Sequence, residues 1–225
     1  MSGTAPVTFL VDVDDTLLDN DRLSADLRRR LEEDLGPQGL ARYLAIFEEL
    51  RAELGYADYL GALQRVGLEL PRDARLFGLS RFLLEYPFAD CVYPGALDVL
   101  GRFRRRGPTV ILSDGDVVFQ PRKIERSGLG AAVDDVLIYV HKERELDAVT
   151  RQYPANHYVL VDDKLRVLDA VKRVWGPRVT TVFPRQGHYA RDPQALATYP
   201  APDVTVERIG ELADRDLSPS LEDAR

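Results

Sequence analysis

Asp12 and Asp14 are the residues best suited to chemistry, because they close a short apolar segment and stand two positions apart. In extended chain, this spacing places both carboxylates on one side, while Val13 points to the other side. Neighbouring carboxylates repel each other, and a divalent cation removes that repulsion. Mg²⁺ prefers oxygen ligands and keeps several waters. The pair therefore predicts a magnesium site, although acids that follow a strand also form turns or helix caps.

A second apolar segment, residues 109–112, is followed by Ser113, Asp114 and Gly115. A hydroxyl group and the backbone amides of a turn can hold phosphate oxygens. Taken alone, such a serine is more often an ordinary turn residue.

Two further apolar segments also end in charged residues. Residues 136–140 precede His141 and Lys142, and residues 158–161 precede Asp162 and Asp163. A lysine there can neutralise a phosphoryl group, and the acids can complete a metal site. Each group has a simpler interpretation, as a surface lysine or as a helix cap. Four polar strand ends in succession favour one shared phosphate site.

The segments that carry these residues alternate with helical patterns. We expect strands at residues 7–13, 109–112, 136–140, 158–161, 179–183 and 204–206. Helical patterns cover residues 95–106, 119–127, 143–153 and 165–175, and residues 184–203 are expected to form a loop. Such alternation predicts an α/β protein with a Rossmann-like, doubly wound parallel sheet. Ligands of these sheets bind beyond the carboxyl ends of the strands, where all four polar groups lie.

A stretch of about 75 residues between Leu17 and Cys91 lacks a convincing strand and predicts three or four amphipathic helices. We interpret it as an inserted α-helical cap, with the core at residues 1–18 and 91–225 and the cap at residues 19–90. Helix boundaries are expected at three N-cap residues and three stop signals, namely Ser24, Asp58, Asp73, Gly36-Pro37, Gly55 and Gly67.

The composition limits the possible partners. No apolar run among the 225 residues approaches the ~18 residues that cross a membrane. The net charge of -7 disfavours binding to nucleic acid or to anionic membranes. Cys91 is the single cysteine, so no internal disulfide can form, and no export segment is evident. We expect a cytoplasmic monomer or homodimer whose partner is a small-molecule phosphate ester.

The four polar strand ends resemble the motifs of the haloacid dehalogenase superfamily. An apolar strand followed by Asp-x-Asp-x-Thr is its first motif, and here it ends at Thr16. The second and third motifs match Ser113 and Lys142, and the fourth matches Asp162 and Asp163. The helical insert is similar to the cap that this superfamily places after its first motif. The resemblance extends from about residue 7 to residue 213.

The resemblance implies a role for each matching residue. Asp12 would be the nucleophile that forms an aspartyl-phosphate, and Asp14 the general acid and base. Asp162, with Asp163, would complete the Mg²⁺ site together with Asp12 and a backbone carbonyl. The residues expected to bind the phosphate ester are Thr16, Ser113, Asp114, Gly115 and Lys142.

Several alternatives remain at this stage. A phosphomutase would share the first step, and a catalytically silent phosphate-binding or interaction protein would share the fold. A receiver-type domain has a different motif order and no cap, and a dehalogenase has no need of an acid such as Asp14. Two departures from the family pattern, Asp15 and Asp114, add negative charge near an anionic substrate. Polar candidates for substrate contact in the cap are Arg42, Tyr43, Arg51, Tyr56 and Tyr59.

Overall fold

The computed structural model describes residues 4–215 and Leu217, so both ends of the expected core lie outside the described residues. Its six strands form one sheet in the order β3-β2-β1-β4-β5-β6. Every neighbouring pair is parallel, as expected. The strands are β1 (Ala5–Val11), β2 (Thr109–Asp114), β3 (Asp135–Tyr139), β4 (Ala155–Val161), β5 (Val179–Pro184) and β6 (Val204–Val206).

Helices cover both faces of the sheet because alternate strand residues are apolar on both sides. Phe9 and Val11 of β1 face one hydrophobic cluster, together with α4 (Ala96–Arg104) and α5 (Phe119–Ser127). Leu10 faces the other cluster, with α6 (Leu146–Gln152) and α7 (Leu165–Trp175). The change of face falls between β1 and β4, which is where ligands bind in doubly wound sheets.

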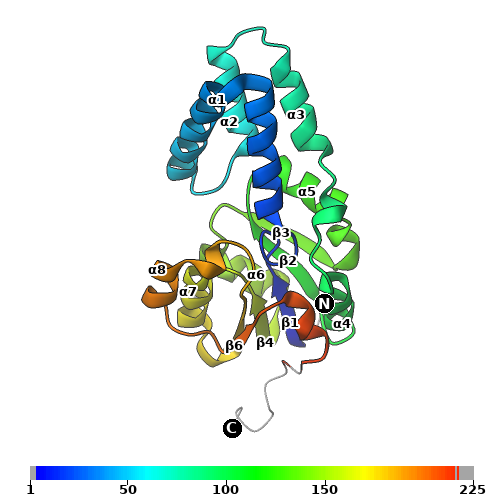
Figure 1. Cartoon of the computed structure of the whole chain (residues 1–225). Helices are drawn as coiled ribbons and strands as arrows, with labels where there is room; N and C mark the ends of the chain where they lie inside the picture. The colour runs from blue at the N-terminus through cyan, green and yellow to red at the C-terminus, as the bar shows by residue number, and fades with distance from the viewer. Residues whose placement is uncertain (1–3, 216, 218–225) are drawn as a thin grey trace.

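The helical insert consists of α1 (Asn20–Leu54), α2 (Tyr59–Glu69) and α3 (Arg75–Glu85), which lie together at the top of Figure 1. Gly36, with a φ of 75° and a ψ of 175°, divides α1 into two helical segments just before Pro37, as expected from the stop signal there. Gly55 ends α1 in the left-handed region, as expected. None of the described helices is long and apolar enough to cross a membrane.

The N-caps of the first two cap helices differ in how well the sequence predicted them. Asp58 caps α2 by accepting a bond from the Gly61 amide, as expected. The prediction of Ser24 as an N-cap was wrong. Helix α1 begins about a turn earlier, where the side chain of Asp19 accepts a bond from the Arg22 amide. Aspartate and serine are about equally good N-caps, so residue type alone does not decide between Asp19 and Ser24.

The chain leaves and re-enters the core at two adjacent points. Leu18 forms an isolated antiparallel bridge with Val92. The Asp19 amide donates to the Cys91 carbonyl at 2.8 Å, and the Tyr93 amide donates to the Leu17 carbonyl at 2.9 Å. These backbone bonds fix the base of the cap beside the end of β1.

Two segments near the sheet edge differ from the expected pattern. Residues 143–153 contain a 3₁₀ turn followed by α6, which is shorter than the expected helix. The expected loop 184–203 contains the short helix α8 (Pro193–Thr198), with Asp192 as its N-cap and proline at its first position. The proline had favoured a loop, but the first turn of a helix also accepts proline.

Candidate active site

Lys142 joins the carboxyl ends of the two central strands. Asp12 follows β1 and Asp162 follows β4, and the pairing of Val11 with Val161 places them side by side. Lys142 Nζ lies 2.5 Å from Asp12 Oδ1 and 2.6 Å from Asp162 Oδ2. All three side chains are buried. The structure therefore brings together three of the residues that the strand-end argument selected.

Asp12, Asp162 and Asp163 form a compact set of carboxylates, here called the strand-end acids. Each offers one oxygen within 4.8 Å of the others. Asp12 Oδ2 and both oxygens of Asp163 are buried without a hydrogen-bond partner in the described part of the chain. Unbonded buried carboxylate oxygens are costly, and a hard divalent cation such as Mg²⁺ satisfies them. The donor set therefore fits a magnesium ion.

The electrostatics of this set follow from burial. Burial raises the pKa of Asp12 despite the opposing effect of Lys142, and burial raises the pKa of Asp163 well above its ordinary value. Burial opposes the charge on Lys142, yet the carboxylates of Asp12 and Asp162 raise the pKa of its ammonium overall. Lys142 thus stays charged, but its single positive charge does not compensate all the carboxylates around it.

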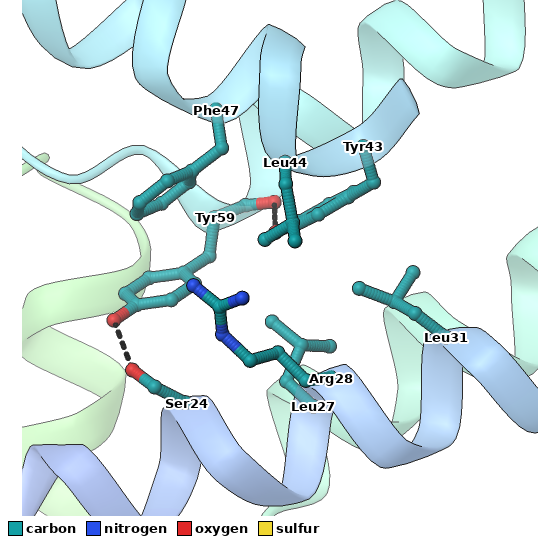
Figure 2. Close-up of a pocket in the computed structure, with 8 residues that line it drawn as sticks. All are labelled: Ser24, Leu27, Arg28, Leu31, Tyr43, Leu44, Phe47 and Tyr59. Atoms are coloured by element: carbon teal, nitrogen blue, oxygen red, sulfur yellow. Dashed lines mark hydrogen bonds between the residues drawn. The ribbon is translucent and has the colours of Figure 1, made fainter. Parts of the chain in front are cut away.

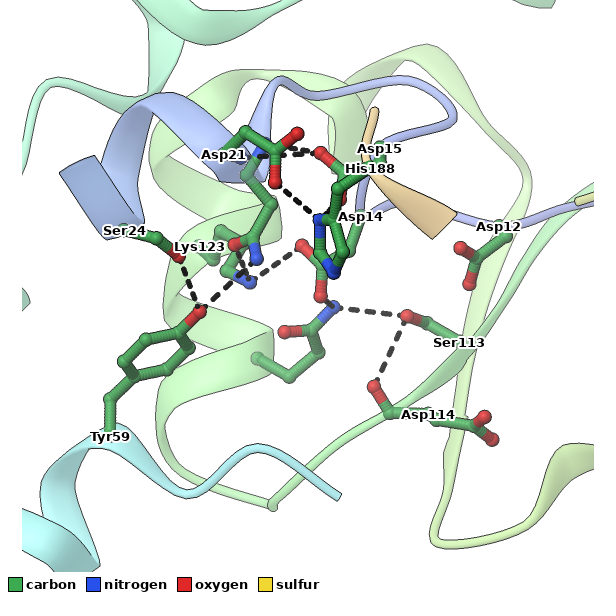
Figure 3. A network of polar contacts seen from close by, with 12 residues as sticks. Asp12, Asp14, Asp15, Asp21, Ser24, Tyr59, Ser113, Asp114, Lys123 and His188 are labelled. Atoms are coloured by element: carbon green, nitrogen blue, oxygen red, sulfur yellow. Dashed lines mark hydrogen bonds and ion pairs between the residues drawn. The ribbon is translucent and has the colours of Figure 1, made fainter. Parts of the chain in front are cut away.

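Asp14 lies in a different setting from Asp12. Its carboxylate accepts a bond of 2.6 Å from Lys123 Nζ and one of 3.2 Å from Gln120 Nε2 (Figure 3). Gln120 Nε2 also donates to the Ser113 hydroxyl at 3.0 Å. The side chain of Asp14 does not belong to the strand-end acids, so the expected metal ligands divide into two groups. Lys123 and Gln120 instead fix the orientation of the Asp14 carboxyl.

Three residues expected to bind the ester are engaged within the protein. The Thr16 hydroxyl accepts a bond from the Asp163 amide, which joins the loop after β1 to the end of β4. Asp114 Oδ1 accepts a bond from the Lys142 amide, and the Gly115 amide donates to the Tyr139 carbonyl. A Cβ at residue 115 would lie 2.8 Å from Gln120 Cβ, so glycine permits this close approach. All three contacts hold the site's loops in place.

Asp15 points toward the base of the cap. Its backbone has a φ of 56°, a left-handed conformation that aspartate tolerates better than most residues. Its Oδ1 accepts bonds from the Asn20 and Asp21 amides in the first turn of α1. The extra charge of this departure from the family pattern therefore anchors a helix N-terminus.

His188 completes a second cluster with Asp15 and Asp21, here called the cap-base cluster. Its Nδ1 lies 2.5 Å from Asp21 Oδ1 and 3.5 Å from Asp15 Oδ2 (Figure 3). Bonding to Asp15, and then to Asp21, raises the pKa of His188. Gly187 approaches Asp15 so closely that a Cβ there would lie 2.4 Å from Asp15 Cβ. Nothing in the local sequence around His188 indicated this contact.

The polar cap residues proposed from the sequence have different surroundings. Tyr43 is buried and donates to the Tyr59 carbonyl, beside a cavity within the cap (Figure 2). Arg42 forms an exposed ion pair with Glu69. The Tyr59 hydroxyl contacts Ser24 and accepts a bond from Asn20 Nδ2 (Figures 2 and 3).

Asn20 extends this contact from the cap to the core. Its Oδ1 accepts a bond of 3.1 Å from Lys123 Nζ, which also holds Asp14. Tyr59 is therefore linked to the Asp14 carboxyl through two intervening side chains. Arg51, by contrast, donates directly to the Tyr189 hydroxyl of the core.

Two residues near the strand ends were missed from the sequence, Lys164 and Tyr189. Lys164 follows Asp163 directly, so its position after a predicted strand already places it beside the strand-end acids. Asp163 and Asp12 raise the pKa of Lys164 against the effect of burial. Tyr189 lies in a turn-rich segment between β5 and α8, and its position depends on tertiary packing.

Comparisons with known proteins agree with this architecture. The sequence model of the haloacid dehalogenase-like hydrolase family matches residues 7–174. A haloacid dehalogenase-like hydrolase from Burkholderia xenovorans LB400 is 63% identical, with a TM-score of 0.90 over 94% of this chain and 99% of that chain. No curated protein matches.

More distant solved structures share the fold. The HAD-hydrolase YfnB from Bacillus subtilis, bound to magnesium, is 18% identical, with a TM-score of 0.59 over 93% of this chain and 97% of that chain. An L-2-haloacid dehalogenase from Xanthobacter autotrophicus is 16% identical, with a TM-score of 0.61 over the same shares, 93% and 97%. At these identities the likeness shows the fold alone.

Proposed function

This chain belongs to the haloacid dehalogenase-like hydrolases, and we propose that it is a cytoplasmic, magnesium-dependent phosphatase of a small-molecule phosphate monoester. The observation that carries the proposal is the different setting of two nearby carboxylates. Asp12 joins the strand-end acids and Lys142, whereas Asp14 contacts Lys123 and Gln120. Carboxylates held in different surroundings suit different roles in one reaction.

Asp12 is the nucleophile of the proposed first step. Lys142 holds its Oδ1, and its Oδ2 has no partner in the described part of the chain. Attack of the Asp12 carboxylate on phosphorus forms an aspartyl-phosphate and breaks the bond between phosphorus and the leaving oxygen. Asp14 gives its proton to that oxygen, so the products are an alcohol and the covalent intermediate.

The second step regenerates the enzyme. Asp14 accepts a proton from water as the water oxygen attacks phosphorus, which releases phosphate and restores the Asp12 carboxylate. Ser113 and Lys142 would hold the phosphoryl oxygens during both steps. Magnesium, bound by the strand-end acids, would offset the repulsion between carboxylate and phosphate.

Dehalogenation is the main rival, because haloacid dehalogenases share this fold. A halide ion leaves without a proton, so that reaction has no use for a carboxyl at residue 14. The unbonded oxygens of the strand-end acids likewise favour a reaction that uses a divalent cation. A phosphomutase would differ only in returning the phosphoryl group to a second hydroxyl.

The proposal is tested with 4-nitrophenyl phosphate in the presence of Mg²⁺. We expect release of 4-nitrophenol that disappears with a chelator and with Asp12→Asn, while the exposed control Asp147→Asn stays active. Halide release from 2-chloropropionate without phosphate ester hydrolysis would contradict the proposal. An isomerised sugar phosphate in place of free phosphate would identify a mutase.

The role of Asp14 is tested by changing the leaving group. We expect Asp14→Asn to slow the first step, followed as alcohol release in a single turnover, by about 10²- to 10⁴-fold for an alkyl phosphate. The first step with 4-nitrophenyl phosphate should be affected much less, because 4-nitrophenolate leaves without a proton. Equal losses in the first step with both substrates would remove the assigned role as acid.

A further inference from the structure

Lys164 places a second ammonium group at the carboxyl end of β4. The Lys164 amide donates to Asp162 Oδ1 at 2.8 Å, which fixes the start of its side chain beside the strand-end acids. Its Nζ lies 5.1 Å from the centroid of the Tyr189 ring. Within the described residues, this Nζ forms no salt bridge and no hydrogen bond. Lys142, in contrast, is fully paired.

Arg51 brings a second cation to the same ring from the cap. Its guanidinium carbon lies 5.6 Å from the Tyr189 centroid, and its Nη2 donates to the Tyr189 hydroxyl. The carboxylate paired with Arg51 is Glu48, at 3.5 Å and one turn away, and its side chain is 62% exposed. Such exposed pairs are weak, so Arg51 can bind a second anion at little cost.

The charges of the site leave Lys164 in excess, and Arg51 has only its weak pair with Glu48. As ligands of a divalent cation, the three strand-end acids are ionised and contribute three negative charges. Lys142 and one divalent cation together supply the three positive charges that balance them. Lys164 and Arg51 are not needed for this balance. An ammonium group that is partly buried without an acceptor is unfavourable unless a ligand supplies one.

We propose that the substrate carries a second anionic group, a carboxylate or a phosphate, on its leaving-group side, and that Lys164 and Arg51 bind this group across the boundary between core and cap. Tyr189 positions the two cations by contacting both. The inference rests on the proposed phosphatase function and narrows its substrate class to phosphate monoesters with two anionic ends.

The test compares probes that differ in one charge. The carboxylate probe is 4-carboxyphenyl phosphate, with 4-carbamoylphenyl phosphate as its neutral counterpart. The phosphate probe is propane-1,3-diol bisphosphate, with 3-hydroxypropyl phosphate as its counterpart. We expect kcat/KM to favour one or both charged probes by about 10- to 100-fold, the size of a charge-assisted bond to the ligand.

The preference should depend on the two cations. Lys164→Met and Arg51→Met are expected to remove most of it, whereas the exposed control Arg65→Met, which breaks only a pair with Glu53, should keep it. The conservative variant Lys164→Arg should retain part of the preference. Equal losses for charged and neutral probes would assign Lys164 to the strand-end acids instead and would overturn the inference.

Calorimetric binding to Asp12→Asn separates this inference from the proposed function. If no probe is hydrolysed, the phosphatase proposal fails, yet tighter binding of a charged probe than of its neutral counterpart still supports the anion site. Equal binding of charged and neutral probes overturns the inference whether or not hydrolysis occurs.

Discussion

The strand-end acids and the cap-base cluster both draw residues from the segment after β1, yet they differ in how many of their oxygens remain unbonded. Asp12 and Asp163 keep buried oxygens without partners in the described part of the chain. In the cap-base cluster, Asp15 Oδ1 accepts two backbone bonds and Asp21 accepts a bond from His188. Asp15 Oδ2 also lacks a hydrogen-bond partner among the described residues, but it lies 3.5 Å from the His188 imidazole, which compensates its charge when protonated. The comparison shows that the two clusters differ in degree, since Asp12 and Asp163 leave more oxygens for a ligand.

The largest expected effect is on the strand-end acids. Lys142→Met should lower the free energy of unfolding by about 3–5 kcal/mol in the presence of a chelator, because it leaves buried carboxylates without their cation. Urea unfolding at pH 7 measures the change. The control Lys172→Met breaks a half-exposed pair with Asp203 and should cost about 1 kcal/mol or less. Similar losses in both variants would mean that Lys142 does not compensate the acids.

Magnesium binding should also distinguish the two clusters, with a smaller change in the free energy of unfolding than Lys142→Met causes. At about 100 times its dissociation constant, Mg²⁺ should stabilise the protein by about 2.7 kcal/mol, since it binds only the folded chain. Thermal unfolding across a Mg²⁺ titration measures this effect. Asp163→Asn should remove most of the stabilisation, while the matched change Asp21→Asn should retain it. Loss in Asp21→Asn alone would place the cation at the cap base.

The smallest effect concerns the pH dependence of the cap-base cluster. Asp15 and Asp21 raise the pKa of His188 above its ordinary value of 6.5, so the folded chain favours the protonated imidazole. This stabilisation is complete below pH 6.5 and disappears as the pH rises through the folded pKa. His188→Gln should therefore lower stability by about 0.5–1 kcal/mol near pH 5.5, a value reduced by solvent screening.

The same substitution should have almost no effect at pH 9. Urea unfolding at both pH values provides the measurement, and Asp21→Asn should show the same pH trend. A constant difference between His188→Gln and the unsubstituted protein at all pH values would show that packing, and not charge, links His188 to the cap.

The core of the site could be predicted from the sequence because its geometry is local. Asp12 and Asp162 follow β1 and β4, Ser113 lies near the end of β2, and the edge of a parallel sheet brings such residues together. The same argument covers Lys142, although its loop required a 3₁₀ turn that the sequence did not indicate. The positions of the apolar strands, and the single sheet edge at which they end, were therefore sufficient to predict that these residues lie together.

The cap contacts could not be predicted in this way. Arg51, His188 and Tyr189 meet only because the kink at Gly36 and the loop after β5 bring distant segments together. No periodic pattern in the sequence predicts the direction in which the chain runs after the kink at Gly36 or through the loop after β5. The bond between Lys123 and Asp14 likewise depends on where α5 packs.

The paired crossing at Leu18 and Val92 allows the insert to change in length without moving the sheet. Because the chain departs and returns at adjacent backbone positions, an insertion of any length closes a loop whose ends already touch, at an entropic cost that grows only slowly with length. The parallel sheet thus keeps its strand register while the inserted helices are lengthened, shortened or exchanged. Substrate recognition can diversify at this point without any change in Lys142 or the strand-end acids.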